Sequence, residues 1–247
     1  LSDNGTQFEP DDDLRIKRAN SQFESLNLLT KIGYDLSNKK RLMLYYNFIE
    51  TDKGVPGLGA FQSETANFKT EAHRSSLRFD TKNLFSPGFN SQFELKYALK
   101  TEAFQDLDGD IGIGKQDNKN QIQSYETSIN TDQVIGEYQV LKTRLQYRKE
   151  SFKPSDKRSA TTAGSSRREI YSIALEDQVT FFNERLFITP GLLYEKINNR
   201  FEGDPGLATL GQEITDIGGK FLSRQIGLLY RITDSLSLRS NIGRYFR

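Results

Sequence analysis

The 247-residue sequence has no cysteine and no tryptophan, and it has a single histidine, His73. The absence of cysteine excludes disulfides, zinc–thiolate centres and thiol catalysis. A run of eighteen apolar residues is also missing, and the mean hydropathy is low at −0.65, so a helical membrane protein is excluded. A membrane β-barrel is not excluded, because its strands alternate apolar and polar residues and average out to a hydrophilic sequence.

An excess of one charge is lacking too. The chain has 34 Lys and Arg residues against 33 Asp and Glu residues, so its charge does not favour a nucleic-acid partner. The length suits one large all-β domain or two small ones. No signal peptide opens the sequence. For a secreted or outer-membrane protein, this predicts either processing or a preceding N-terminal part.

The dominant pattern is an alternation of apolar and polar residues with a period of two, which is typical of strands. In residues 26–36, leucine, isoleucine and tyrosine share one face, whereas Asn27, Lys31 and Asp35 share the other. After a short polar turn the pattern resumes at 42–48, which predicts a hairpin. We expect about ten strands in about five hairpins, from these two runs and from others at 74–80, 93–100, 141–148, 171–181, 188–194, 226–232 and 236–242.

The connections alternate in length. Tight turns alternate with long polar segments near 51–68, 104–121, 152–167 and 199–219. Short turns at one end and long loops at the other are the layout of an outer-membrane barrel. Several predicted strands are also long enough to cross a membrane at a tilt, which takes about 9–11 residues. The sequence therefore predicts an all-β fold, an antiparallel meander that forms a segment of a transmembrane barrel.

The polar face of these strands carries charge. A small soluble barrel would bury such side chains without partners, whereas a wide barrel has a wet or protein-filled interior that tolerates them. The alternative is a soluble sheet with one solvated face. The charged residues on this face are Arg74, Arg78, Lys96, Arg144, Arg148 and Arg239. We expect interfacial aromatic girdles built from Tyr34, Tyr45, Tyr46, Tyr97, Tyr147, Tyr194 and Tyr230.

Several short motifs resemble the barrel of TonB-dependent receptors. The stretch 54–57, Gly-Val-Pro-Gly, is similar to the start of an exposed loop in that family. Residues 174–195 resemble a barrel hairpin, with Leu193 where the family commonly has arginine. Residues 226–247 resemble a second hairpin, and the opening Asn4-Gly5-Thr6 with the acidic run 11–13 resembles an extracellular loop.

This resemblance implies a barrel of 22 strands around an N-terminal plug domain, coupled to the TonB energy-coupling complex. Residues 1–247 would be a partial barrel domain without the plug, in the bacterial outer membrane and in contact with its lipid. The implied function is active import of a scarce nutrient such as siderophore–iron, haem or cobalamin, with no catalytic residue. Two alternatives are a passive porin-like or small complete barrel, whose first and last strands pair, and an outer-membrane hydrolase that depends on His73.

An acidic cluster is the first candidate site. Its carboxylates are spaced like the ligands of a calcium loop, although Ile111 occupies the position where such a loop has glycine. The alternative is a solvated acidic loop, and no other cofactor is expected. The candidate ligands are Asp106, Asp108, Asp110 and Asp117.

A basic, hydroxyl-rich segment at 151–168 is the second candidate. Its cations would attract anionic ferric siderophores or lipopolysaccharide phosphates. A solvated loop is again the alternative. The candidate ligand-binding residues are Lys153, Lys157, Arg158, Arg167 and Arg168.

Overall fold

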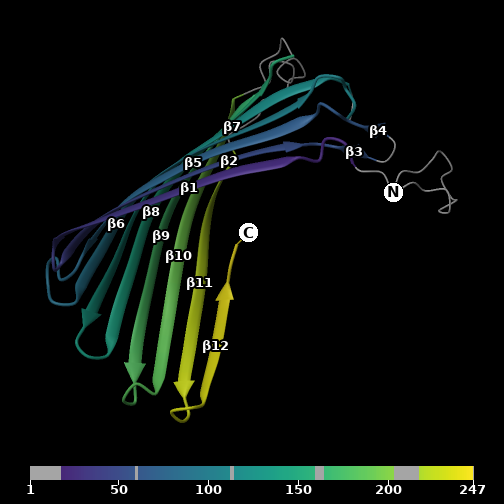
Figure 1. Cartoon of the computed structure of the whole chain (residues 1–247). Coiled ribbons are helices and arrows are strands. Elements are labelled where there is room, and N and C mark those ends of the chain that lie inside the picture. The colour runs from purple at the N-terminus through teal and green to yellow at the C-terminus, as the bar shows by residue number, and fades with distance from the viewer. Residues whose placement is uncertain (1–17, 59–60, 112–113, 159–163, 203–216, 247) are drawn as a thin grey trace.

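The computed structural model describes residues 18–58, 61–111, 114–158, 164–202 and 217–246. Ten long strands form one antiparallel sheet in which each strand pairs with the next along the chain (Figure 1). They are β1 (Phe23–Ser37), β2 (Lys40–Gly54), β5 (Asn67–Thr81), β6 (Phe89–Asp106), β7 (Gln116–Ile135), β8 (Gln139–Asp156), β9 (Ser165–Phe181), β10 (Leu186–Glu202), β11 (Ile217–Arg231) and β12 (Ser237–Arg244). The described residues include no helix long and apolar enough to cross a membrane.

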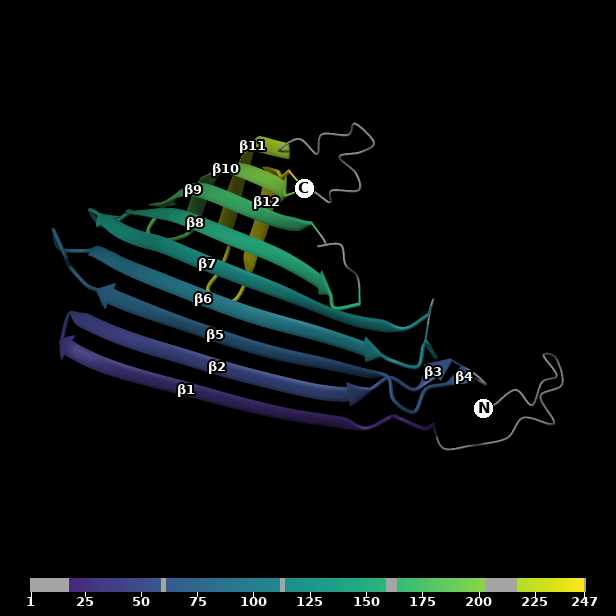
Figure 2. The ribbon, with the colours of Figure 1, turned by 90° about the horizontal axis from the view of Figure 1, so that it is seen from above.

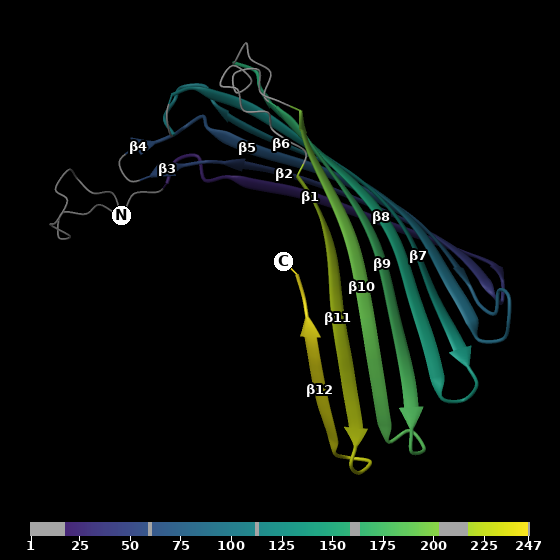
Figure 3. The ribbon, with the colours of Figure 1, turned by 180° about the vertical axis from the view of Figure 1, so that it is seen from behind.

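The predicted meander of about ten strands is thus confirmed, and so is the alternation of short and long connections (Figure 3). A two-residue hairpin, β3 (Gly57–Leu58) with β4 (Phe61–Gln62), lies within the β2–β5 connection. The strands extend further into the predicted loops than expected. For example, β7 already begins at Gln116 and β8 continues to Asp156. Most side chains in these extensions are polar on both faces, so the sequence there shows no alternation that would indicate a strand.

The sheet is a single curled layer (Figures 1 and 2). In its described part β1 and β12 stand at opposite ends of the strand order and do not pair. The mark of a small complete barrel, pairing between the first and last strands, is therefore not found in the described residues.

The two faces of the sheet differ in curvature as well as in polarity. Small side chains on the polar face are buried although no second layer covers them: Ser128 is 2%, Ser172 7% and Ser223 9% exposed. Neighbouring side chains converge over a concave face and diverge over a convex one, so the polar face is the inner, concave one. The apolar residues of the outer face remain exposed, as Leu28, Ile129 and Ile173 illustrate.

The connection between β2 and β5 is fastened by Asn20, just before β1. The Asn20 side-chain amide donates to the carbonyl oxygen of Ala66 at 2.5 Å and to that of Val55 at 3.3 Å. The backbone adds bonds from Gly54 to Gln22 and from Val55 to Ala66. Glycine is needed at 54, because a Cβ there would lie 2.1 Å from Asn20 Oδ1 and 2.4 Å from the Asn20 carbonyl oxygen.

We expect Gly54→Ala to destabilise this end of the wall by about 1–3 kcal/mol, since the added methyl forces backbone to move. Hydrogen exchange at Gly54 and Val55 should become faster. Gly227→Ala is the matched control, because its Cβ would meet Thr189 Cβ at an ordinary 3.6 Å. Equal exchange rates in the Gly54→Ala variant and the wild type would contradict the proposed role of Gly54 in the close contact with Asn20.

Candidate functional site

The outer face carries a band of apolar side chains with a row of tyrosines along the edge nearer the long loops. Tyr97 lies opposite Tyr125, and Tyr147 lies opposite Tyr171, each pair with ring centroids 5.0 Å apart. The hydroxyls of Tyr97 and Tyr125 both accept hydrogen bonds from Gln123, which lies beyond the band. The rings of Tyr97 and Tyr125 thus lie against the apolar band while their hydroxyls reach the polar zone, the arrangement expected at a membrane–water interface.

The band slopes across the sheet. One row of paired residues runs from Tyr34 on β1 through Leu145 on β8 to Tyr194 on β10. On β1 the upper edge of the band is Leu26, eight residues above Tyr34 of this row, whereas on β10 the upper edge is Tyr194, which is in the row itself. The edge therefore drops by roughly eight residues relative to the row over seven steps from strand to strand. This slope corresponds to a strand tilt of about 40°, within the range of membrane barrels. At that tilt a band of about ten residues is roughly 25 Å tall, the height of the apolar zone of such barrels.

His73 lies on this outer face, near the band's upper edge. Its Nδ1 is 2.9 Å from the Tyr46 hydroxyl, its Nε2 is 2.8 Å from Glu71 Oε1, and its ring lies against Phe48. No serine, threonine or cysteine side chain completes a nucleophilic arrangement with these groups among the interactions of the described residues. Tyr46 thus belongs to the girdle as predicted, but Tyr45 points inward beneath Lys31, so its predicted girdle position is wrong.

The inner face is a lattice of ion pairs, and it carries all six charged residues predicted there. Lys96 Nζ lies 3.0 Å from Glu94 and 3.1 Å from Glu126, which joins β6 to β7. Lys142 pairs with Glu176 at 3.0 Å across β8 and β9, and Arg148 pairs with Glu150. Because both signs are interleaved, the wall is strongly polar without a large net charge, which suits water or a polar protein segment.

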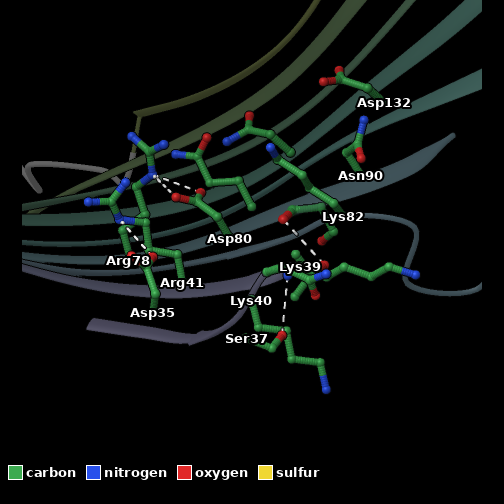
Figure 4. A pocket seen from close by; sticks show the side chains of 15 residues that line it. Asp35, Ser37, Lys39, Lys40, Arg41, Arg78, Asp80, Lys82, Asn90 and Asp132 are labelled. Carbon is green, nitrogen blue, oxygen red and sulfur yellow. Dashed lines mark hydrogen bonds and ion pairs between the residues drawn. The ribbon is translucent and has the colours of Figure 1, made fainter. Parts of the chain in front are cut away.

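A polar hollow of about 460 Å³ opens on the inner wall at the short-turn end (Figure 4). Arg78 Nε pairs with Asp80 at 2.8 Å and Arg41 Nε with Asp35 at 3.4 Å, while Lys39, Lys40 and Lys82 surround the turns. Aromatic and aliphatic side chains are absent from this lining. The hollow is therefore suited to a hydrated or protein surface rather than to an apolar small molecule.

A second inner hollow, of about 250 Å³, lies at the long-loop end between β7 and β10. It differs in chemistry, because Ile122, Phe152 and Phe201 line it together with Arg168. Both phenylalanines are exposed on an otherwise polar wall. Arg168 donates from Nε to Asn199 Oδ1 at 2.8 Å, and its guanidinium remains exposed. A cation beside exposed aromatic surface can bind a small anion that also has apolar or aromatic parts.

The basic segment is split by the alternation of the strands. Lys153 lies on the outer face of β8 and Arg167 on the outer face of β9, whereas Arg168 points inward. Lys157 lies just after the end of β8. Arg158 lies in the turn after β8, and Lys157 pairs with Asp117 at 3.2 Å. The five predicted residues therefore do not form one cluster. Arg167 and Arg168 both border the inner hollow, but only the side chain of Arg168 is on the inner face. Sequence reasoning missed Phe152 and Phe201, which the parity of β8 and β10 could have placed beside it.

The acidic segment folds around Asp106, which is fully buried. Its carboxylate accepts backbone hydrogen bonds from Gly109 at 2.8 Å, Asp110 at 3.0 Å and Ile111 at 2.7 Å. The other carboxylates have separate partners: Asp108 accepts from Thr65 at 2.6 Å, and Asp117 accepts from Gln105.

The described residues contain no group of three or more side chains placed to hold a metal ion. The geometry thus gives the predicted calcium loop no support, because Asp106 closes a turn with the oxygens that calcium would need. The expectation that no cofactor is required stays a prediction.

The ionisation of Asp106 is tied to this turn. Burial raises the pKa of the Asp106 carboxyl, but the three backbone donors favour the charged form more strongly, so its pKa lies below the usual range. A carboxylate with a lowered folded-state pKa contributes stability that is present above the unfolded-state pKa of about 3.9. That contribution is lost as the pH falls through the folded-state value.

We expect Asp106→Asn to loosen the β6–β7 turn by about 1.5–3 kcal/mol, because hydrogen bonds to a charged acceptor are lost. Amide exchange at residues 109–111 should speed up, and acidification below about pH 4 should do the same in the wild type alone. Asp110→Asn is the control, since only the backbone of Asp110 bonds to Asp106. If added calcium slowed exchange in the wild type, the assignment of Asp106 to the turn alone would be wrong.

Comparisons with known proteins agree with this geometry. The family model described as "TonB dependent receptor-like, beta-barrel" matches residues 4–247. No curated protein matches the sequence. Similar solved structures include the FrpB iron transporter from Neisseria meningitidis, with 15% identity over 90% of this chain and 36% of that chain and a TM-score of 0.71.

Two further structures are similar. The ferric-catecholate import receptor Fiu from E. coli has 11% identity over 92% of this chain and 47% of that chain, with a TM-score of 0.69. The copper transporter OprC has 12% identity over 91% of this chain and 36% of that chain, with a TM-score of 0.74. At such identities the likeness shows the fold alone, and the chain spans less than half the length of each of these proteins.

Proposed function

Because the chain belongs to the TonB-dependent receptor β-barrel family, we propose that it forms part of the wall of a receptor in the bacterial outer membrane. The receptor imports a scarce small-molecule nutrient with energy from the TonB complex. The observation that carries this proposal is the sloping apolar band, whose tilt and height match a membrane span, on the reverse of a charged inner wall. The family consists of transporters rather than enzymes, which agrees with the expectation of no catalytic residue.

The place of nutrient capture follows from the layout of the wall. Long loops of membrane barrels face the outside of the cell, so the inner hollow at the long-loop end opens toward arriving nutrient. Arg168 beside Phe152 and Phe201 favours a ligand that combines negative charge with apolar or aromatic surface, such as siderophore–iron or haem. The ion-paired wall and the polar hollow below suit contact with a polar plug domain of the whole receptor.

Capture at this hollow is tested with the whole receptor carrying Arg168→Gln or Phe152→Ala. Arg168→Gln removes a charge-assisted contact and should weaken binding of the transported ligand by about 10–100-fold. Phe152→Ala removes aromatic surface beside that cation and should weaken binding as well. The readout is binding and cellular uptake of iron as ferric citrate, ferric catecholate and haem. Lys153→Gln is the matched control, because Lys153 lies on the same strand as Phe152 but on the outer face. Unchanged affinity in both hollow variants would contradict a role in capture.

The energy source separates active import from the passive porin alternative. In cells that lack TonB, uptake through the wild-type receptor should fall to background. Uptake that persists without TonB would favour passive diffusion through a polar lumen.

The assignment of the outer face of the sheet to lipid can be tested on β9. Leu175 lies near the middle of the apolar band and is 42% exposed, whereas Gln178 lies on the inner face of the same strand. We expect Leu175→Arg to cost about 2–4 kcal/mol of folding free energy in lipid vesicles, the value for a cation at the bilayer midplane. Gln178→Arg should cost far less, because the inner face is polar. Equal losses in the two variants would refute the assignment of the outer face to lipid.

A further inference from the structure

Four cationic side chains lie in two directly opposed pairs on the outer face of β10, β11 and β12. Lys196 lies opposite Lys220 across β10 and β11, and Arg224 lies opposite Arg244 across β11 and β12. All four are exposed. We call these four residues the cationic edge.

These pairings are unfavourable as they stand. Like charges directly opposite each other on neighbouring strands destabilise a sheet. Some other cations on the outer face have acidic partners: Lys69 lies 2.5 Å from Glu50 and Lys157 lies 3.2 Å from Asp117. Within the described part of the chain, no ion pair involves any member of the cationic edge. The contact found for these four is that of Arg244 with the Phe246 ring, at 5.4 Å.

The cationic edge follows the upper boundary of the apolar band. Lys196 is the next outward residue above Tyr194 on β10. Ile226 and Ile242 pair with each other, and they are the next outer-face residues below Arg224 and Arg244. On β11 the exposed outer-face residue Leu222 lies between Lys220 above it and Arg224 below it. Because the band drops along the sheet, Arg224 and Arg244 still lie close to its upper boundary. In a membrane this is the depth at which acyl chains end and headgroup phosphates begin.

An apolar groove of about 290 Å³ adjoins the cationic edge on the same face. It is lined chiefly by Ile129, Leu145 and Ile173 and by the ring pair Tyr147 and Tyr171. Tyr171 lies directly opposite Lys196 across β9 and β10, so the groove adjoins the cationic edge at Lys196. A molecule with an acyl chain and a phosphate can therefore contact both at once.

We propose that the cationic edge binds the phosphate groups of a phosphorylated membrane lipid, with an acyl chain of that lipid in the adjoining groove. Each phosphate is held between two opposed cations and accepts charge-assisted hydrogen bonds from both. The inference rests on the proposed membrane-spanning wall, and it adds a specific lipid site. The occupant is a lipid rather than free phosphate, because the groove places apolar surface beside the cations.

The test uses the whole receptor, purified in a neutral detergent. It is titrated with a bis-phosphorylated glycolipid, with a neutral lipid of the same acyl chains and with inorganic phosphate. We expect the phosphorylated lipid alone to raise the thermal midpoint, and this effect to weaken with salt. In the variant K196Q/K220Q/R224Q/R244Q the affinity for that lipid should fall at least tenfold.

A second variant keeps the proposal falsifiable if the quadruple variant folds poorly. K220Q/R244Q removes one cation from each pair, so repulsion within the sheet is relieved. Without lipid its thermal midpoint should rise above that of the wild type. With the phosphorylated lipid present, the thermal midpoint of the variant should be lower than that of the wild type, because lipid binding stabilises the wild type more. K115Q/K119Q, two exposed cations near the long loops, is the control and should change neither value.

Three results would overturn the proposal. They are undiminished lipid affinity in the quadruple variant, equal effects of the neutral and phosphorylated lipids, and inorganic phosphate stabilising the wild type as well as the lipid does. The proposed import function is judged separately by TonB-dependent uptake and by the contrast between Leu175→Arg and Gln178→Arg. Normal uptake together with any of the three results would therefore refute the lipid site alone.

Discussion

Hydrogen bonding between neighbouring backbones is the constraint on which the rest of this wall depends. A chain that crosses a membrane has no water for its peptide groups, so each strand must be paired on both sides throughout the apolar zone. Pairing fixes register, and register fixes which side chains face lipid, because a slip of one residue exchanges the two faces. The unbroken register between β6 and β7 thus places Tyr97 against Tyr125 outside and Lys96 against Glu126 inside.

The sequence predicted the fold where polarity alternates and failed where it does not. The outward Leu26, Leu28 and Ile32 of β1 mark a strand with one lipid face. None of the predicted runs covers β7, the longest strand, and its first part, residues 116–121, is polar on both faces. That part of the strand stands above the apolar band, where both faces meet water or polar protein and selection for alternation ends. Tyr45 was misplaced for a related reason: an aromatic residue beside another, Tyr46, gives no sign of which one faces inward.

The candidate sites were predicted less well, because they depend on pairing between strands. Asp106 was singled out by spacing, but spacing cannot tell a metal ligand from a carboxylate that accepts backbone hydrogen bonds. Arg167 and Arg168 look equivalent in sequence, yet alternation sends them to opposite faces. The opposition of Lys196 and Lys220 becomes visible only once β10 and β11 are in register, since 24 positions separate the two residues.

The slope of the apolar band also constrains what can be joined to this sheet. The apolar band is staggered from strand to strand, so each further strand must begin its apolar run about one residue lower than the strand before it. A strand added beside β12 with a level band would carry polar side chains into lipid and leave apolar ones in water. The stagger of the band therefore restricts the register in which neighbouring strands can pair. It also sets the total stagger, or shear, with which a complete barrel closes.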